Sequence, residues 1–173
     1  MKQTIIVLAV LLCLAACQYE IPELPKETQN GLDTFGCLVN GELVVPYENG
    51  YYQKKYIPHA EYNLQTKELK IIGYGQNYQM FTFTVINPQE AKVMIIDTVM
   101  YYPFNSNSDV YYGGNDIGEM ELTYFNTANG IASGHFRFTG YKCSAIDKSI
   151  IDRNDFVTVT KGYFDINLTI LNH

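Results

Sequence analysis

Histidine, serine and carboxylate side chains are the groups in this chain that suit acid–base or nucleophilic catalysis, and the chain has three histidines. Ser133 and His135 stand two residues apart, a nucleophile and a base of the types that a hydrolase uses. Residues two apart on a strand lie roughly 6–7 Å apart, which is beyond hydrogen-bond reach. His59 follows Pro58 in a Tyr-rich segment, and His173 is terminal. Since neither G-x-S-x-G nor H-E-x-x-H occurs, we expect no catalytic residue.

Oxygen-bearing side chains at Asn105, Asn107 and Asp109 have the spacing of the first ligands of a calcium-binding loop, and Asp116 occupies its twelfth position. Val110, however, stands where an EF-hand loop requires glycine, and the last ligand is Asp instead of Glu. The segment therefore predicts a polar surface loop, and we expect neither a metal nor another cofactor.

Cys37 and Cys143 form an even pair in a chain that is expected to reach an oxidising compartment. A disulfide between them would close a loop of about 106 residues, worth about 4–5 kcal/mol in the chain-entropy model. The alternation of apolar residues places Cys37 inward, beside Phe35, and Cys143 outward, which opposes the bond. Two interpretations remain: a disulfide, or a free Cys37 that packs as a small core residue.

Tyrosine is abundant, with 15 residues, whereas tryptophan is absent. Tyrosine offers a large amphipathic contact surface and is enriched in binding sites, although glycan-binding platforms usually add tryptophan. The residues cover the rims of a β domain or, if their loops converge, form a binding site for a protein or a glycan. The candidate residues are Tyr47, Tyr51, Tyr52 and Tyr56 in one segment and Tyr101, Tyr102, Tyr111 and Tyr112 in another.

The first residues read as an export signal. Lys2 precedes an apolar stretch, Ile5–Ala16, which has the length of a signal-peptide core and is too short to span a bilayer. It ends in Leu-Ala-Ala-Cys17, which resembles the lipobox of bacterial lipoproteins. The resemblance implies cleavage before Cys17, acylation of that residue with chains such as palmitate, and stable attachment to a membrane. Gln18 favours the outer membrane, with the periplasmic or cell-surface face left open.

Composition narrows the class of protein. A net charge of -6 and a pI near 5.0 argue against a nucleic-acid partner. Apolar content of 47% and charged content of 17% argue against a disordered chain. We expect a signal peptide over residues 1–16, a lipidated cysteine and tether over 17–33, and one β domain over 34–173.

The β domain is predicted from alternating apolar residues and turn signals. Asn40-Gly41 and Asn129-Gly130 indicate hairpins, as does Gln65-Thr66-Lys67. The apolar phase flips after Lys161-Gly162, which predicts a bulge. We expect a single antiparallel β-sandwich or flattened barrel of about nine or ten short strands.

Three further segments carry local expectations. The residues from 93 to 101 are apolar on both faces and predict a strand covered on both sides. Residues 88–92 predict one helical turn, and residues 144–155 a short helix or loop.

Residues 24–46 read L-P-K-E-T-Q-N-G-L-D-T-F-G-C-L-V-N-G-E-L-V-V-P. This stretch resembles the N-terminal signature of a family of small Bacteroidota lipoproteins that carry a domain of unknown function. Lys26 departs from the proline that the family often has. Weaker matches continue at residues 62–69, 133–138 and 157–165, so the resemblance covers most of the chain after the signal. The resemblance implies the class and the location of the protein. It implies no molecular role, because the family has no established activity.

The sequence thus predicts a noncatalytic β domain, lipid-anchored at the outer membrane, that binds a protein or glycan partner. One alternative is a structural subunit of an envelope assembly that uses an exposed edge strand and takes no small ligand. A hydrolytic enzyme is the second alternative.

Overall fold

The computed structural model describes residues 23–46, 56–103, 110–114, 118–144 and 146–172. Within these ranges the chain is built of β-strands, and its one helical element is the 3₁₀ turn η1 (Gln76–Tyr78). The predicted all-β class is confirmed, with eleven strands where about nine or ten were expected. The described part contains no helix that is long and apolar enough to cross a membrane.

Two strands near the C-terminus are much longer than the rest, at 13 and 22 residues, and run through both layers of the fold. In chain order the strands are β1 (Thr34–Val39), β2 (Glu42–Val44), β3 (His59–Asn63), β4 (Glu68–Tyr74), β5 (Met80–Ile86), β6 (Val93–Ile95), β7 (Thr98–Tyr102), β8 (Val110–Gly114), β9 (Gly118–Asn126), β10 (Ile131–Cys143) and β11 (Ile150–Leu171).

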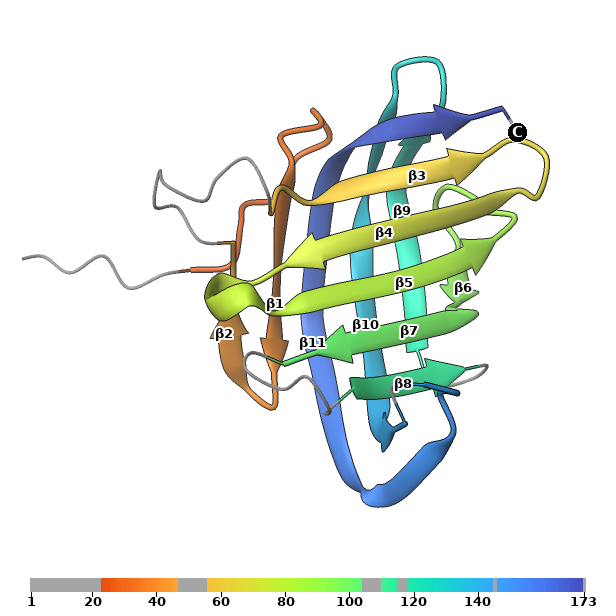
Figure 1. The fold of residues 1–173 in the computed structure, drawn as a ribbon. Helices are drawn as coiled ribbons and strands as arrows, with labels where there is room; N and C mark the ends of the chain where they lie inside the picture. Colours follow the sequence, from red (N-terminus) through yellow and green to blue (C-terminus); the bar gives the residue numbers. More distant parts are fainter. Residues whose placement is uncertain (1–22, 47–55, 104–109, 115–117, 145, 173) are drawn as a thin grey trace, which may run out of the picture.

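The strands form one sheet in the order β2-β1-β11-β3-β4-β5-β7-β8-β10-β9-β6, which closes on itself because β10 also pairs with β11. We call β3, β4, β5, β7 and β8 the front layer and the remaining strands the back layer. The front layer faces the viewer in Figure 1, and its strands cross those behind at a steep angle. β11 reaches the front layer by parallel pairing with β3, and β10 by antiparallel pairing with β8. The result is a flattened barrel, antiparallel except for that one pair.

Aromatic rings from both layers fill the interior. The ring centroid of Phe35 in β1 lies 5.3 Å from that of Phe81 in β5 and 5.3 Å from that of Phe136 in β10. Phe83 lies 4.7 Å from Phe136. The ring of Phe35 also covers Gly73, where a Cβ atom would come within 2.2 Å of it, so a larger residue at position 73 would displace the ring. These contacts join the front and back layers into one core.

The predicted hairpins are confirmed. β1 and β2 pair antiparallel across Asn40 and Gly41, whose φ angles of 51° and 87° are those of a type I′ turn. Lys67 and Gly130 adopt positive φ angles in the β3–β4 and β9–β10 turns. Asn126 completes the second of these turns, since its Oδ1 accepts two backbone N–H groups.

The predicted bulge in the last strand is also confirmed. One extra residue of β11 is inserted between Gly162 and Val159 relative to β10, and Lys161 in the bulge has a φ of 50°. Val159 and Phe164, on opposite sides of the bulge, are therefore both fully buried in the core. Without the extra residue, one half of β11 would turn its apolar side chains to solvent.

The single covered strand expected between residues 93 and 101 is wrong. The chain divides there into β6 and β7 at Asp97, whose Oδ2 accepts the N–H of Ile86. Among the described strands, β6 lies at an edge of the back layer and pairs with β9 alone. Val93 and Ile95 are accordingly 64% and 48% exposed, because no described strand covers them.

The helical turn expected in residues 88–92 is likewise wrong, whereas of the short helix or loop expected in residues 144–155 the chain forms a loop, which ends where β11 begins. In residues 88–92, Ala91 has a φ of 56° and Glu90 forms an isolated bridge with Leu122, so the segment bends and makes no helical turn. The connection after Cys143 is a short turn, in which the N–H of Ser144 donates to the carbonyl of Ser149. Residues from 150 onward are already part of β11.

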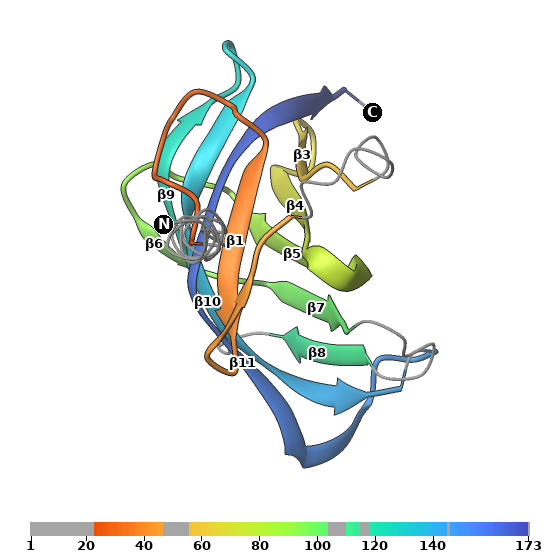
Figure 2. The same ribbon diagram turned by 90° about the vertical axis from the view of Figure 1, so that its left-hand side faces the viewer.

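Residues 23–33, expected to belong to a tether, lie against the barrel. Figure 2 shows this segment, in red-orange, passing across β9, β10 and β11 before it enters β1. Its side chains and backbone bond to all three strands. We call residues 27–33 the strap.

Candidate functional site

The outer side of the front layer carries a continuous cross-strand row of side chains. The register places Thr82 between Ile72 and Met100, and Met100 beside Tyr112. Directly paired residues lie on the same face of a sheet, so the row continues in both directions. In full, this outer row consists of His59, Ile72, Thr82, Met100, Tyr112, Tyr141 and Phe156, one residue from each of β3, β4, β5, β7, β8, β10 and β11.

Alternation along each strand fixes the direction in which the row points. Phe81 and Phe83, on either side of Thr82, are fully buried in the core. Thr82 lies on the opposite side of β5, where its neighbours in the row leave it 7% exposed. Phe156, at the end of the row, is 50% exposed. Figure 1 shows no described strand lying over this side of β4, β5 and β7.

A shorter row of the same kind lies next to the outer row. Met80 pairs with Tyr74 on one side and with Tyr102 on the other. The hydroxyl of Tyr102 donates to the Sδ atom of Met100 at 3.3 Å, which ties the two rows together. Tyr56 packs edge-on against Tyr74, with ring centroids 5.4 Å apart. The surface is thus a patch of aromatic and thioether groups.

The charge on this patch is low. Burial, and then the neighbouring Tyr56, raises the pKa of the Tyr74 phenol, which keeps it neutral at physiological pH. At the far end, the Arg153 guanidinium lies 5.7 Å from the ring centroid of Tyr141. The ion pair between Lys70 and Glu61, 3.9 Å apart, belongs to the next row along β3 and β4 and forms a polar rim.

The eight predicted tyrosines divide into three groups. Tyr102 and Tyr112 lie on the outer patch, and Tyr56 packs against it. Tyr101 and Tyr111, which alternate with them along β7 and β8, point inward: Tyr101 is 4% exposed and Tyr111 packs against the core. Tyr47, Tyr51 and Tyr52 lie outside the described residues, as do Cys17 and residues 104–109 and 115–117.

Sequence reasoning missed several members of the patch. Met80 and Met100 were not singled out, because methionine on a strand reads as ordinary core. The alternation along Met80–Ile86 did carry a signal. The residues that alternate with Phe81 and Phe83 point outward, and Met80 is one of them. The cross-strand register that aligns these residues has no signature in the sequence. The remaining unpredicted members are Ile72, Tyr74, Tyr141 and Phe156.

The outer side of the back layer is occupied by the strap. Asp165 of β11 is fully buried and accepts hydrogen bonds from the hydroxyls of Thr28 and Ser133 and from the N–H groups of Asn30 and Gly31, the last at 2.9 Å. Burial opposes ionisation of this carboxyl, but the hydrogen bonds outweigh it and lower its pKa. The carboxylate therefore holds the strap to β10 and β11.

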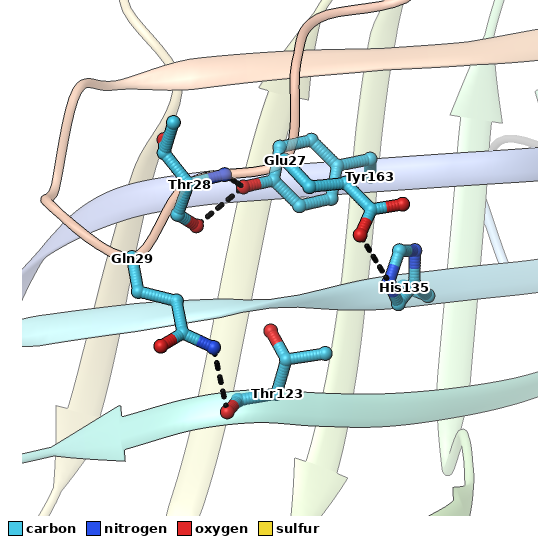
Figure 3. Close-up of polar contacts among 6 residues, drawn as sticks. All are labelled: Glu27, Thr28, Gln29, Thr123, His135 and Tyr163. Atoms are coloured by element: carbon cyan, nitrogen blue, oxygen red, sulfur yellow. Dashed lines mark hydrogen bonds and ion pairs between the residues drawn. The ribbon is translucent and has the colours of Figure 1, made fainter.

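Further contacts of the strap appear in Figure 3. Thr28 exchanges hydrogen bonds with the phenol of Tyr163, and Gln29 Nε2 donates to the carbonyl of Thr123 at 3.0 Å. The Glu27 carboxylate lies 3.6 Å from Nε2 of His135. These contacts reach β11, β9 and β10 in turn, so the strap belongs to the folded domain.

Among the described residues, those considered for catalysis are not assembled into a reactive site, whereas His173 and the predicted calcium-type ligands lie outside that part of the chain. Ser133 Oγ donates to Asp165 at 2.7 Å, whereas His135 faces Glu27. The ring of His59 bonds the backbone carbonyl of Ile57. No cluster of three potential metal ligands occurs among the described residues.

Cys37 and Cys143 are both free and buried, so the structure does not contain the disulfide that the sequence allowed. The inward position of Cys37 is confirmed, and burial raises the pKa of its thiol to about 12. Cys143 lies on the same face of β10 as Tyr141, as expected, because β10 pairs with β8 without a register shift and Cys143 pairs with Val110, which alternates with the core-packed Tyr111. On that face it is fully buried and not exposed.

No protein-family model, no curated protein and no solved structure matches this chain.

Proposed function

We propose that this protein is a noncatalytic protein-binding domain, held at the outer membrane by lipid on Cys17, and that its binding surface is the outer patch of the front layer. The observation that carries the proposal is the outer row, in which seven strands place mostly aromatic and apolar side chains side by side.

The composition of the patch supports a protein partner. Tyr, Phe, Met and Arg are the residues enriched at the centres of protein interfaces, and Lys, Glu and Asp are depleted there. The outer row contains none of those three, and the charged pair of Lys70 and Glu61 stands at its edge. A glycan platform would be expected to include tryptophan, of which the chain has none.

A noncatalytic role agrees with the bonding of the polar groups. The hydroxyl of Ser133 is engaged by Asp165, so His135 has no nucleophile beside it. The site considered for nucleophilic chemistry is thereby used to hold the strap.

The location rests on the Leu-Ala-Ala-Cys17 motif and on the resemblance to Bacteroidota lipoproteins. A Cys17→Ser variant is expected to leave the membrane fraction and to lose incorporation of labelled palmitate. Protease treatment of intact cells then distinguishes the two faces of the outer membrane, since only a surface-exposed domain is cleaved.

Photo-crosslinking in intact cells tests the binding surface. With p-benzoylphenylalanine at position 112, in the middle of the outer row, we expect one adduct of defined mass. The same probe at position 137, on the exposed outer side of the back layer, is the matched control and gives none. Met100→Glu places a charge beside position 112 and is expected to abolish the adduct while the melting temperature stays nearly unchanged. Equal adducts at both positions, or an adduct that survives Met100→Glu, contradict the proposal.

A structural assembly subunit is the second candidate, and the exposed edge strand β6 favours it. Val93 and Ile95 expose apolar side chains on a strand whose outer edge no described strand pairs. Val93→Lys together with Ile95→Lys would disperse a high-mass envelope complex built through β6. If that complex persists in the double variant and is lost in Met100→Glu, the outer patch is the surface in use.

A further inference from the structure

A pocket of about 260 Å³ opens at one end of the barrel, where the β1–β2 hairpin meets the ends of β5 and β7. The mouths of β-barrels are common positions for small-ligand sites. The polar and aromatic residues of its lining are Asn40, Glu42, Gln79, Tyr101 and Tyr111. It uses the two predicted tyrosines that point inward, whereas the proposed protein-binding patch uses their outward neighbours.

The size of the pocket limits the ligand to one ring. A volume of 260 Å³ equals on the order of nine water molecules at about 30 Å³ each. This lies just below the roughly 300 Å³ at which pockets for drug-sized molecules begin. A ring with its substituents fits, whereas an acyl chain or a peptide does not.

Polar atoms in the pocket wall have hydrogen-bonding capacity left over. The Tyr101 hydroxyl accepts a bond from Gln79 Nε2 at 3.2 Å, and no acceptor for its own proton is present among the described residues. Within the same residues, the buried Oε1 of Gln79 has no donor. Asn40 uses its Oδ1 to bind Thr158 N–H, which leaves its Nδ2 donor for a ligand.

The charge of the pocket wall excludes anionic ligands, and its polar atoms exclude purely apolar ones. Glu42 is the charged residue of the lining, so an anion is repelled. Burial raises the pKa of Tyr101, with a smaller contribution from Glu42, and the phenol therefore remains a donor. A purely apolar ring would leave the phenol and amide groups unpaired at a cost of about 1–3 kcal/mol each.

A neutral sugar meets all of these conditions. Its hydroxyl groups both accept, as Tyr101 and Asn40 require, and donate, as Glu42 requires. Its C–H face can lie against the aromatic ring of Tyr111, which is only partly buried. We propose that the pocket at the barrel mouth binds a single neutral pyranose residue, free or at the end of a glycan. This activity is separate from the proposed protein contact, because Tyr101 and Tyr111 face away from the outer patch.

Ligand-observed NMR on the full chain in detergent tests the proposal with a panel of neutral methyl pyranosides, including an N-acetylated one. We expect saturation transfer to at least one of them, and much weaker transfer to a uronic acid and to cyclohexanol. Tyr101→Phe removes the donor proton and keeps the ring, so affinity should fall about 10-fold. Tyr102→Phe, the next residue on the same strand but facing outward, is the matched control and should leave binding unchanged. Glu42→Gln should weaken binding and reduce discrimination against the uronic acid.

Two results would overturn the pocket proposal. One is the absence of transfer to every pyranoside up to about 10 mM, beyond which binding is negligible. The other is binding that Tyr101→Phe and Glu42→Gln leave intact, which would place the sugar elsewhere. A polymer carrying the bound pyranose, compared with the free methyl glycoside, then tells a glycan terminus from a free sugar. Neither result affects the photo-crosslinking at position 112, so the two proposals fail separately.

Discussion

The two outer sides of this barrel differ in what covers them. On the back layer, polar groups such as Ser133, His135 and Asp165 receive the strap, which the chain itself supplies. On the front layer, Met100 and Tyr112 belong to an aromatic and thioether patch over which no described strand passes. The polar side is satisfied within the molecule by directed hydrogen bonds. The apolar side has no such partner among the described residues, and its burial against another molecule would be favourable.

If the outer patch binds the partner as proposed, function and stability separate on this fold. Hydrogen bonds to a buried carboxylate are worth more than those between neutral groups, so the strap side should carry stability. Side chains of the front patch contact solvent on one side, and their removal should cost little in folding while abolishing partner contact. Each prediction below tests one side of this contrast.

The largest expected effect is at Asp165. Asp165→Asn replaces one carboxylate oxygen by an amide donor that faces the N–H groups of the strap, and should lower the free energy of unfolding by about 3 kcal/mol. Urea unfolding followed by circular dichroism measures the change. Asp152→Asn, at an exposed carboxylate that accepts a single backbone bond, is the matched control and should change stability by less than about 0.5 kcal/mol.

Thiol modification extends the same test to β1, which follows the strap. Cys37 is buried and its raised pKa keeps it protonated, so it should react with an alkylating agent only when the domain opens. Asp165→Asn should speed this reaction about 100-fold, the factor that corresponds to about 3 kcal/mol. Mass spectrometry of the peptide that contains Cys37 gives the rate. Equal rates in the wild type and in Asp165→Asn would show that the strap does not protect β1.

Acid should remove the contribution of Asp165. Its folded-state pKa lies below the ordinary value of 3.8, so the unfolded chain takes up the proton first as the pH falls. The stabilisation is therefore present above about pH 4 and is lost as the pH drops toward the folded-state pKa. Urea midpoints measured between about pH 2.5 and pH 7 should fall less steeply in Asp165→Asn than in the wild type. Parallel curves for the two proteins would assign the acid sensitivity to other groups.

Substitution on the open side should cost less. Met100→Gln and Tyr112→Gln are each expected to lower the free energy of unfolding by about 1 kcal/mol or less, because both side chains already touch solvent. A cost above about 2 kcal/mol would mean that the patch is part of the core, and the contrast between the two sides would fail.

The smallest effect is expected from the ion pair at the edge of the strap. Glu27 and His135 are 72% and 38% exposed at the side chain, and exposed pairs contribute about 0–1 kcal/mol. Glu27→Gln should therefore change stability by less than about 0.5 kcal/mol. A loss of stability as large as that of Asp165→Asn would show that this ion pair, and not the buried carboxylate, holds the strap.

Much of the fold followed from local patterns. The turn at Asn40-Gly41 and the bulge at Lys161 were predictable because positive φ angles and a change of apolar phase leave a local signature. Predictions failed where tertiary pairing overrode the local pattern. Cys143 became buried on the outer face of β10, where it pairs with the buried Val110, and Val93 became exposed because β6 took an edge.

The candidate site was only half visible in advance. The surplus of tyrosine pointed to β7 and β8. Composition does not show that Tyr101 faces the pocket and Tyr102 the patch, because pairing with the neighbouring strands sets which face each residue occupies. Met80 and Met100 joined the patch through pairing with residues distant in the sequence.

The sequence by itself determined most of the strands, the hairpin turns and the inward phase of residues such as Phe83 and Phe164, because a two-residue period and turn chemistry act over a few residues. Tertiary structure alone decided that residues near position 30 bind Asp165 and that seven strands align one outer row. Those outcomes depend on the register between strands, which is set by packing of the whole barrel.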